Sequence, residues 1–139
     1  MISLADYWMG RDTIHAADMD PGLIANATLL LSRVNPLLLK LAALGQKVEK
    51  SPATGTLVTS GWRPASLNAH VRNAAPRSKH IAGLAIDLYD PSGDLDEFLF
   101  AHPALLADLG LWAEHPAATK GWCHLQCVPP RSGNRFFFP

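Results

Sequence analysis

The chain lacks several features that define common protein classes. Twelve basic and twelve acidic residues give a net charge of zero, which argues against a surface built to bind nucleic-acid phosphates. No apolar run reaches the roughly 18 residues that suggest a membrane span, and the N-terminus has neither the basic nor the apolar segment of a signal peptide. We therefore expect neither nucleic acid nor membrane as a partner. We also expect a protein that is made in the cytoplasm and leaves it only if another factor carries it out.

Cysteine is scarce as well, since Cys123 and Cys127 are the only two. Both fall on one predicted strand, four residues apart, which separates them by about 13 Å. A disulfide needs Cα atoms closer than about 7 Å. We expect two reduced thiols packed in the core rather than a disulfide or a zinc-binding pair.

The composition favours a single domain over residues 1–139. Hydrophobic residues make up 48% of the chain and charged residues 17%, values typical of globular rather than disordered proteins. There is no internal repeat and no linker. We expect a monomeric α+β domain whose helices pack on one small, largely antiparallel sheet.

A long helix is the clearest predicted element. Asp20 and Pro21 form a helix start, leucines follow at helical spacing, and Gly45 suits the C-terminal cap. Pro36 predicts a kink or break near Asn35. The remaining elements are shorter. An N-terminal arm at 5–12 is expected to pack its aromatic residues on the body, with a wall of the substrate cleft as the alternative. Strands are expected at 56–60, 84–89, 110–114 and 121–128. Helices are expected at 65–75, 95–100 and 103–109, with Phe100 turned inward, and a docked tail at 131–139.

The most informative stretch is 78–87, which carries His80 and Asp87 with Gly83 between them. The three protein ligands of a catalytic zinc ion lie about 2 Å from it, so their donor atoms lie within about 4 Å of one another. Residues seven apart lie about 10 Å apart along a helix and on opposite faces of a strand. His80 and Asp87 can therefore share an ion only if the backbone bends at Gly83. These residues alone leave open a plain strand end with a surface histidine.

The candidate third ligand is His124. On the predicted strand 121–128, Trp122, His124 and Gln126 alternate onto one face, while the two cysteines lie on the other. This pattern puts His124 on the polar side of the sheet. Another histidine, His70, is expected to be a solvated helix residue rather than a fourth ligand.

Together these motifs resemble the zinc D-Ala-D-Ala carboxypeptidases, a family that includes the VanY-type enzymes and many phage endolysins. The Hedgehog signalling domain shares the fold of that family. The likeness lies in Ser-x-His-x-x-Gly-x-Ala-x-Asp at 78–87, Trp-x-His at 122–124, and Ser-Gly-Trp-Arg-Pro at 60–64 followed by Asn68. It covers about residues 60–126, with a weaker likeness to small phage-type members before residue 50. It implies Zn²⁺ held by His80, Asp87 and His124.

The resemblance also implies roles in substrate binding. Arg63 would clamp a peptide carboxylate, because its planar guanidinium binds carboxylates in a bidentate way. Ser78 would orient His80 or the substrate, and Asn68 belongs to the same substrate-binding group. For Arg63 the residues leave open a surface position or a structural pair with an aspartate.

The general base departs from the family pattern. Many relatives carry an acidic residue three positions before the last histidine, where this chain has Gly121. Glu114 is the nearest substitute, because a hairpin would return His124 to its side. His115 would polarise the carbonyl or stabilise the oxyanion. A salt bridge from Glu114 to Lys120 is the alternative, and Asp90 and Glu97 are weaker candidates for the base.

The expected function is a zinc peptidase that cuts peptidoglycan stem peptides. The resemblance implies either a D,D-carboxypeptidase or an L-Ala-D-Glu-type endopeptidase, and the small size suits a phage or prophage protein. Such an enzyme would reach the cell wall after holin-type release or as part of a virion. The alternative, supported by Gly121, is a non-catalytic peptide-binding or virion structural module stabilised by zinc. A two-histidine, one-carboxylate site also suits iron(II).

Overall fold

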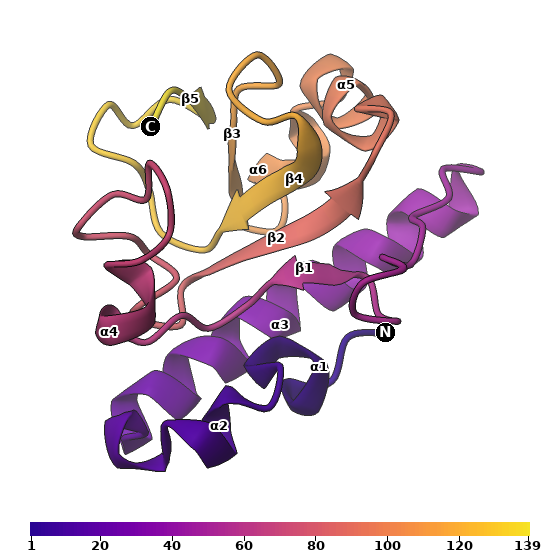
Figure 1. Cartoon of the computed structure of the whole chain (residues 1–139). Coiled ribbons are helices and arrows are strands. Elements are labelled where there is room, and N and C mark those ends of the chain that lie inside the picture. The colour runs from indigo at the N-terminus through magenta and orange to yellow at the C-terminus, as the bar shows by residue number, and fades with distance from the viewer.

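The computed structural model describes all 139 residues, which form one five-stranded sheet with helices around it (Figure 1). The helices are α1 (Leu4–Trp8), α2 (Arg11–Ile14), the 3-10 helix η1 (Ala16–Asp18), α3 (Pro21–Ala43), α4 (Ala65–Asn68), α5 (Asp94–Ala101) and α6 (Ala104–Ala107). The strands are β1 (Val58–Ser60), β2 (Ala85–Asp90), β3 (Trp112–Glu114), β4 (Gly121–Gln126) and β5 (Phe136–Phe137).

The strands are ordered β1-β2-β4-β3-β5 across the sheet. Neighbouring strands are antiparallel except for the parallel pair β3 and β5. The predicted α+β class with a largely antiparallel sheet is therefore confirmed. The tail contributes the short strand β5, which the sequence did not predict.

The long helix α3 supplies much of the core. Asp20 caps it by accepting a hydrogen bond from the Leu23 amide at 2.8 Å. The helix is continuous through Pro36, so the predicted break near Asn35 does not occur. Core contacts on either side compensate for the missing backbone hydrogen bond. The helix buries one face, made of Leu23, Ala27, Leu30, Leu31, Val34, Leu37 and Leu41.

By length and composition alone, α3 could also cross a membrane. Core helices of soluble proteins pass the same test, and the buried face of α3 belongs to the same apolar cluster as the inner side chains of the sheet. The helix is thus accounted for as a core element, and the expected absence of a membrane partner stays a prediction.

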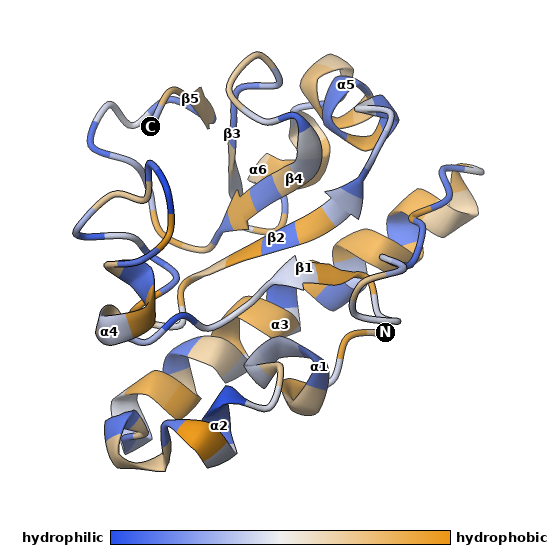
Figure 2. Ribbon diagram, in the orientation of Figure 1, coloured by the Kyte–Doolittle hydropathy of each residue, from blue (hydrophilic) through white to orange (hydrophobic).

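The two faces of the sheet differ in chemistry, as the alternating colours along β2 and β4 indicate (Figure 2). We call the apolar side the inner face; it consists of Val58, Ile86, Leu88, Ala113, Cys123 and Leu125, all buried in the main core cluster. Both cysteines are free and buried, as predicted. The other side, the polar face, carries the candidate site.

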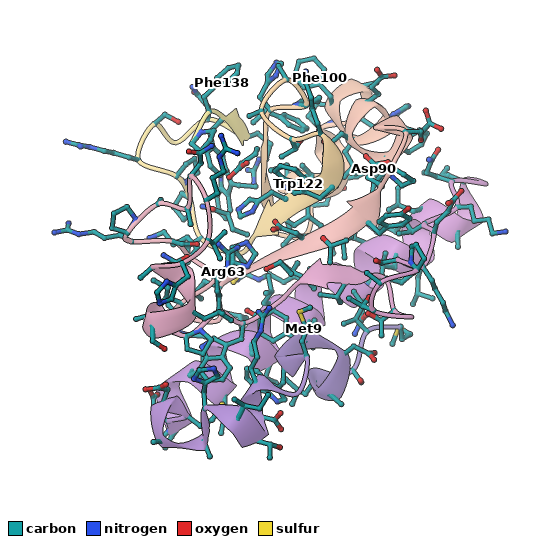
Figure 3. All side chains as sticks on the ribbon, viewed as in Figure 1. Met9, Arg63, Asp90, Phe100, Trp122 and Phe138 are labelled. Carbon is teal, nitrogen blue, oxygen red and sulfur yellow. The ribbon has the colours of Figure 1, made fainter.

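The N-terminal arm packs its aromatic residues on the body, as predicted. Tyr7 and Trp8 are buried, and the Tyr7 hydroxyl donates to the Ala85 carbonyl at 3.0 Å. Two local predictions were wrong. The helix expected at 65–75 covers only Ala65–Asn68, and Phe100 is 48% exposed rather than turned inward. Phe100 lies at the outer edge of the molecule with Phe138 (Figure 3), where it packs edge-on against His115 and Phe136.

Candidate metal centre

The site is built on one row of residues across the polar face. Strand register pairs Ser60 with Asp87 and Asp87 with His124, and Glu114 with Phe137. Ala113 pairs with Leu125, so Glu114 stands next to His124 in the same row. Antiparallel pairing thus gathers residues that are far apart in sequence into one line, with Asp87 and His124 at its centre.

His80 reaches this row from a loop. The Ser78 hydroxyl accepts a hydrogen bond from the His80 amide at 3.3 Å, which helps to shape the turn before the histidine. Gly83 then has φ of +75°, and a Cβ there would lie 2.8 Å from a methyl carbon of Leu23 on α3. The predicted bend at Gly83 is therefore present, and both the backbone angle and the close packing favour glycine.

His80, Asp87 and His124 come together as the sequence predicted. Asp87 Oδ1 lies 3.3 Å from His80 Nε2 and 2.8 Å from His124 Nδ1. Each residue offers one donor atom, and these atoms all lie within 4.8 Å of one another. All three residues are buried. This group could bind a metal ion, because two imidazole nitrogens and one carboxylate oxygen form a typical donor set for a divalent transition metal.

Outer contacts hold each of the three donors. His80 Nδ1 lies 2.8 Å from the Gly61 carbonyl oxygen, which can only accept, so Nε2 is left for a ligand. Nε2 of His124 faces Gln126 Oε1 at 3.3 Å. Both imidazoles therefore have the outer partner that metal-binding histidines usually have. The alternation along β4 predicted the face on which Gln126 lies but indicated no role for this residue.

Arg63 lies between α4 and β2 (Figure 3) and supports the third donor. Its guanidinium is 4.0 Å from Asp87 Oδ2 and donates to Ser60 Oγ and Asn68 Oδ1 at 3.3 and 3.2 Å. With 8% of its surface exposed, Arg63 is a structural pair to an aspartate, one of the alternatives left open. Asn68 is buried and also donates to the Ala75 carbonyl at 2.9 Å. Roles of Arg63, Asn68 and Ser78 in binding substrate stay predictions.

Glu114 lies beside the three donors. Its Oε1 is 3.9 Å from His124 Nδ1, and no ion pair joins it to Lys120. Asp90 does not share this position, because its carboxylate accepts from the amides of Leu95 and Asp96 and so caps α5. Glu97 lines a separate polar recess between α5 and the β3–β4 loop. Of the three carboxylates considered for the base, Glu114 alone stands in the row.

His115, predicted to polarise the carbonyl or stabilise the oxyanion, does not lie among the three donors, and its catalytic role stays a prediction. Its ring stacks on Phe138 at 4.6 Å and meets the edge of Phe100 at 4.9 Å, while its Nδ1 accepts from the Ala117 amide. Strand alternation turns it to the side opposite Glu114. Instead, the tail residue Phe137 approaches the site, with its ring edge-on to His124 at 6.1 Å.

The electrostatics of the site follow from burial and mutual contact. Burial alone would raise the pKa of Asp87, but the charge of His80 and the hydrogen bond from His124 outweigh it and hold that pKa below its usual range. Burial alone would lower the pKa of His124, but Asp87 raises it. Burial raises the pKa of the Glu114 carboxyl, only partly offset by His124. Such a shift suits a carboxylate that exchanges protons.

Comparison with known proteins adds no further assignment. No family profile, curated protein or solved structure matches the chain. The geometry of the site and the motifs in the sequence are therefore the observations on which a functional proposal depends.

Proposed function

We propose that the protein is a zinc metallopeptidase. More specifically, we propose an enzyme of the D-Ala-D-Ala carboxypeptidase type, with a Hedgehog-like fold, that hydrolyses peptidoglycan stem peptides. The observation that carries the proposal is the convergence of three buried donors, His80, Asp87 and His124, with a carboxylate next to them. Three protein ligands leave a fourth position open, as catalytic rather than structural zinc requires.

In this proposal His80 Nε2, Asp87 Oδ1 and His124 Nδ1 hold Zn²⁺. A zinc ion there supplies Lewis acidity, which polarises a carbonyl and makes water acidic at neutral pH. Glu114 takes the proton from the attacking water and passes it to the leaving amine, since a carboxylate of raised pKa can do both. Arg63, Ser78 and Asn68 help to position the peptide substrate.

The departure at position 121 has a structural explanation that favours Glu114 as the base. Gly121 has φ of +99°, a backbone angle that side-chain-bearing residues rarely adopt. It pairs with Asp90 at the far end of β4, three residues from His124 and therefore on the opposite face. An acidic residue there would be strained and badly directed.

The test combines metal content, product analysis and one substitution. The purified protein is expected to hold one zinc per chain and to release D-Ala or a cut stem peptide from purified peptidoglycan, as seen by mass spectrometry. Glu114→Gln is expected to keep the zinc and lose about 10²–10⁴-fold in kcat. Glu97→Gln, a matched change in the separate recess, is expected to keep full activity.

The same experiment separates the competing proposal, a zinc-stabilised binding or virion module. Zinc in the parent protein without any product would overturn the peptidase and favour the module. No bound metal would overturn both. The product mass would also separate the D,D-carboxypeptidase from the L-Ala-D-Glu endopeptidase, the two activities that the motifs imply.

We propose a phage or prophage origin, with release to the wall by a holin or as a virion component.

A further inference from the structure

The outer nitrogen of His124 faces a side-chain acceptor, Gln126, whereas the outer nitrogen of His80 faces a backbone carbonyl. Gln126 ends β4, two residues after His124 on the same face, and is 3% exposed. Its Oε1 lies 3.3 Å from His124 Nε2, and its Nε2 donates to the Val128 carbonyl at 2.8 Å. Gln126 therefore links the histidine to the backbone at the end of its own strand.

The carbonyl of Val128 fixes which way the Gln126 amide points. A backbone carbonyl can only accept, so the amide nitrogen must face Val128 and the amide oxygen must face His124. An oxygen in that place accepts a hydrogen bond, so His124 carries a proton on Nε2. Nδ1, which lies 2.8 Å from Asp87 Oδ1, is then the nitrogen left to bind a metal. In the metal-free protein Nδ1 donates a hydrogen bond to that carboxylate, and a bound metal would take the place of its proton.

We infer that Gln126 is a positioning residue that holds His124 in the tautomer whose Nδ1 faces the metal. The inference rests on the metal site of the proposed function but not on peptidase activity. His80 receives the equivalent support from the backbone carbonyl of Gly61, which no substitution can remove. The hydrogen-bond acceptor of His124, unlike that of His80, can therefore be removed by substituting one side chain, Gln126.

The test measures zinc affinity by competition with a chromogenic chelator. Gln126→Met has a similar length but no oxygen acceptor, and its zinc dissociation constant is expected to rise about 10–100-fold. Gln126→Glu keeps an acceptor toward His124 and is expected to bind zinc within about threefold of the parent. Gln46→Met, at the only other glutamine, makes the same chemical change outside the site and is expected to leave zinc affinity unchanged.

Each outcome decides the inference. Weak binding by the Met variant with near-normal binding by the Glu variant supports it. Equal binding by Gln126→Met and the parent overturns it. Weak binding by both variants also overturns it, because the acceptor would then not be what matters. Chemical unfolding of each metal-free variant shows whether a loss of affinity reflects misfolding.

A second measurement needs no variant. The ¹⁵N resonances of His124 in the zinc-loaded parent protein are expected to show a proton on Nε2 and none on Nδ1, and a proton on Nδ1 would overturn the inference. Neither measurement uses peptide hydrolysis. A protein that binds zinc through Gln126-supported His124 but cuts no peptide would contradict the proposed function and leave this inference standing.

Discussion

The inner and polar faces of the sheet are made by the same strands but differ in what their side chains do. On β4, Cys123 and Leu125 are fully buried in the core cluster, and His124 between them belongs to the donor group. On β2, Asp87 stands between Ile86 and Leu88 in the same way. On each strand, therefore, the residue of the donor group lies between two residues that are buried in the core.

This arrangement suggests why the site needs no disulfide or second domain. Strand pairing and core packing fix Asp87 and His124 to each other, and sites on regular elements hold their geometry better than sites on loops. His80 comes from a loop, and its position depends on the Gly61 carbonyl and on packing at Gly83. The inner face provides stability, which offsets the cost of the buried polar groups on the polar face.

The largest contrast is expected between two neighbours on β4. Leu125→Ala on the inner face should lower the free energy of unfolding by about 2–5 kcal/mol, because it leaves a cavity in the core. It should still bind one zinc per chain. His124→Ala on the polar face should lose zinc binding, and with it the stabilisation that zinc adds, which is about 2.7 kcal/mol at a concentration 100 times the dissociation constant.

Denaturant unfolding with and without zinc measures both effects. The comparison between the faces fails if His124→Ala keeps its zinc-dependent stabilisation. It also fails if Leu125→Ala loses zinc while folded.

A smaller effect is expected at the bend that brings His80 to Asp87. Gly83→Ala must adopt a left-handed backbone angle and also push against Leu23 on α3. Gly55 has a similar φ, +72°, but a Cβ there would meet no atom within 4 Å. Gly55→Ala therefore carries only the conformational cost of roughly 1–2 kcal/mol.

We expect Gly83→Ala to be less stable than Gly55→Ala and to bind zinc more weakly, while Gly55→Ala binds it normally. Unfolding curves and zinc titrations of the two variants check this. Equal losses of stability would mean that packing against α3 does not constrain the bend.

Much of this arrangement could be predicted from short-range pattern. The alternation on β4 predicted which side chains share a face, and the bend at Gly83 followed from the spacing of His80 and Asp87. The start of α3 followed from Asp20 and Pro21. In each case the signal lies within a few residues, where backbone geometry decides the outcome.

The features that were missed depend on contacts between distant segments. The tail pairs with β3 as β5 because that edge of the sheet is open, which no local pattern in 131–139 indicates. Pro36 was expected to kink or break α3, and the break does not occur, because packing on both sides of Pro36 outweighs one missing hydrogen bond. Ser60, Asn68 and Asp87 surround Arg63, and no spacing within residues 60–64 indicates these contacts.

The smallest expected effect distinguishes two buried carboxylates, Asp87 on the polar face and Asp96 beside Cys123 on the inner side. Burial raises the pKa of Asp96, and the hydrogen bond from Thr119 offsets this only in part. Between the ordinary aspartate pKa of about 3.9 and the raised folded value, the unfolded chain has lost this proton while the folded protein keeps it. Asp96 therefore makes stability fall as pH rises through that window.

Asp87 acts in the opposite direction, since the folded protein holds its pKa below the usual range. The stability that Asp87 contributes in the metal-free protein is present above the ordinary pKa and is lost as pH falls toward the folded value. The two carboxylates therefore affect stability in different pH windows, one above and one below the ordinary pKa.

Replacing Asp96 by Asn should remove the loss of stability that the parent shows as pH rises. The free energy of unfolding of metal-free Asp96→Asn, measured in urea from about pH 4 upward, should improve relative to the parent with increasing pH and then level off. Asp108→Asn, at an exposed position, controls for the loss of one negative charge. Parallel stability curves for the parent and Asp96→Asn would mean that burial does not raise the pKa of Asp96. That result would contradict the contrast with Asp87, whose pKa is set by its histidine partners.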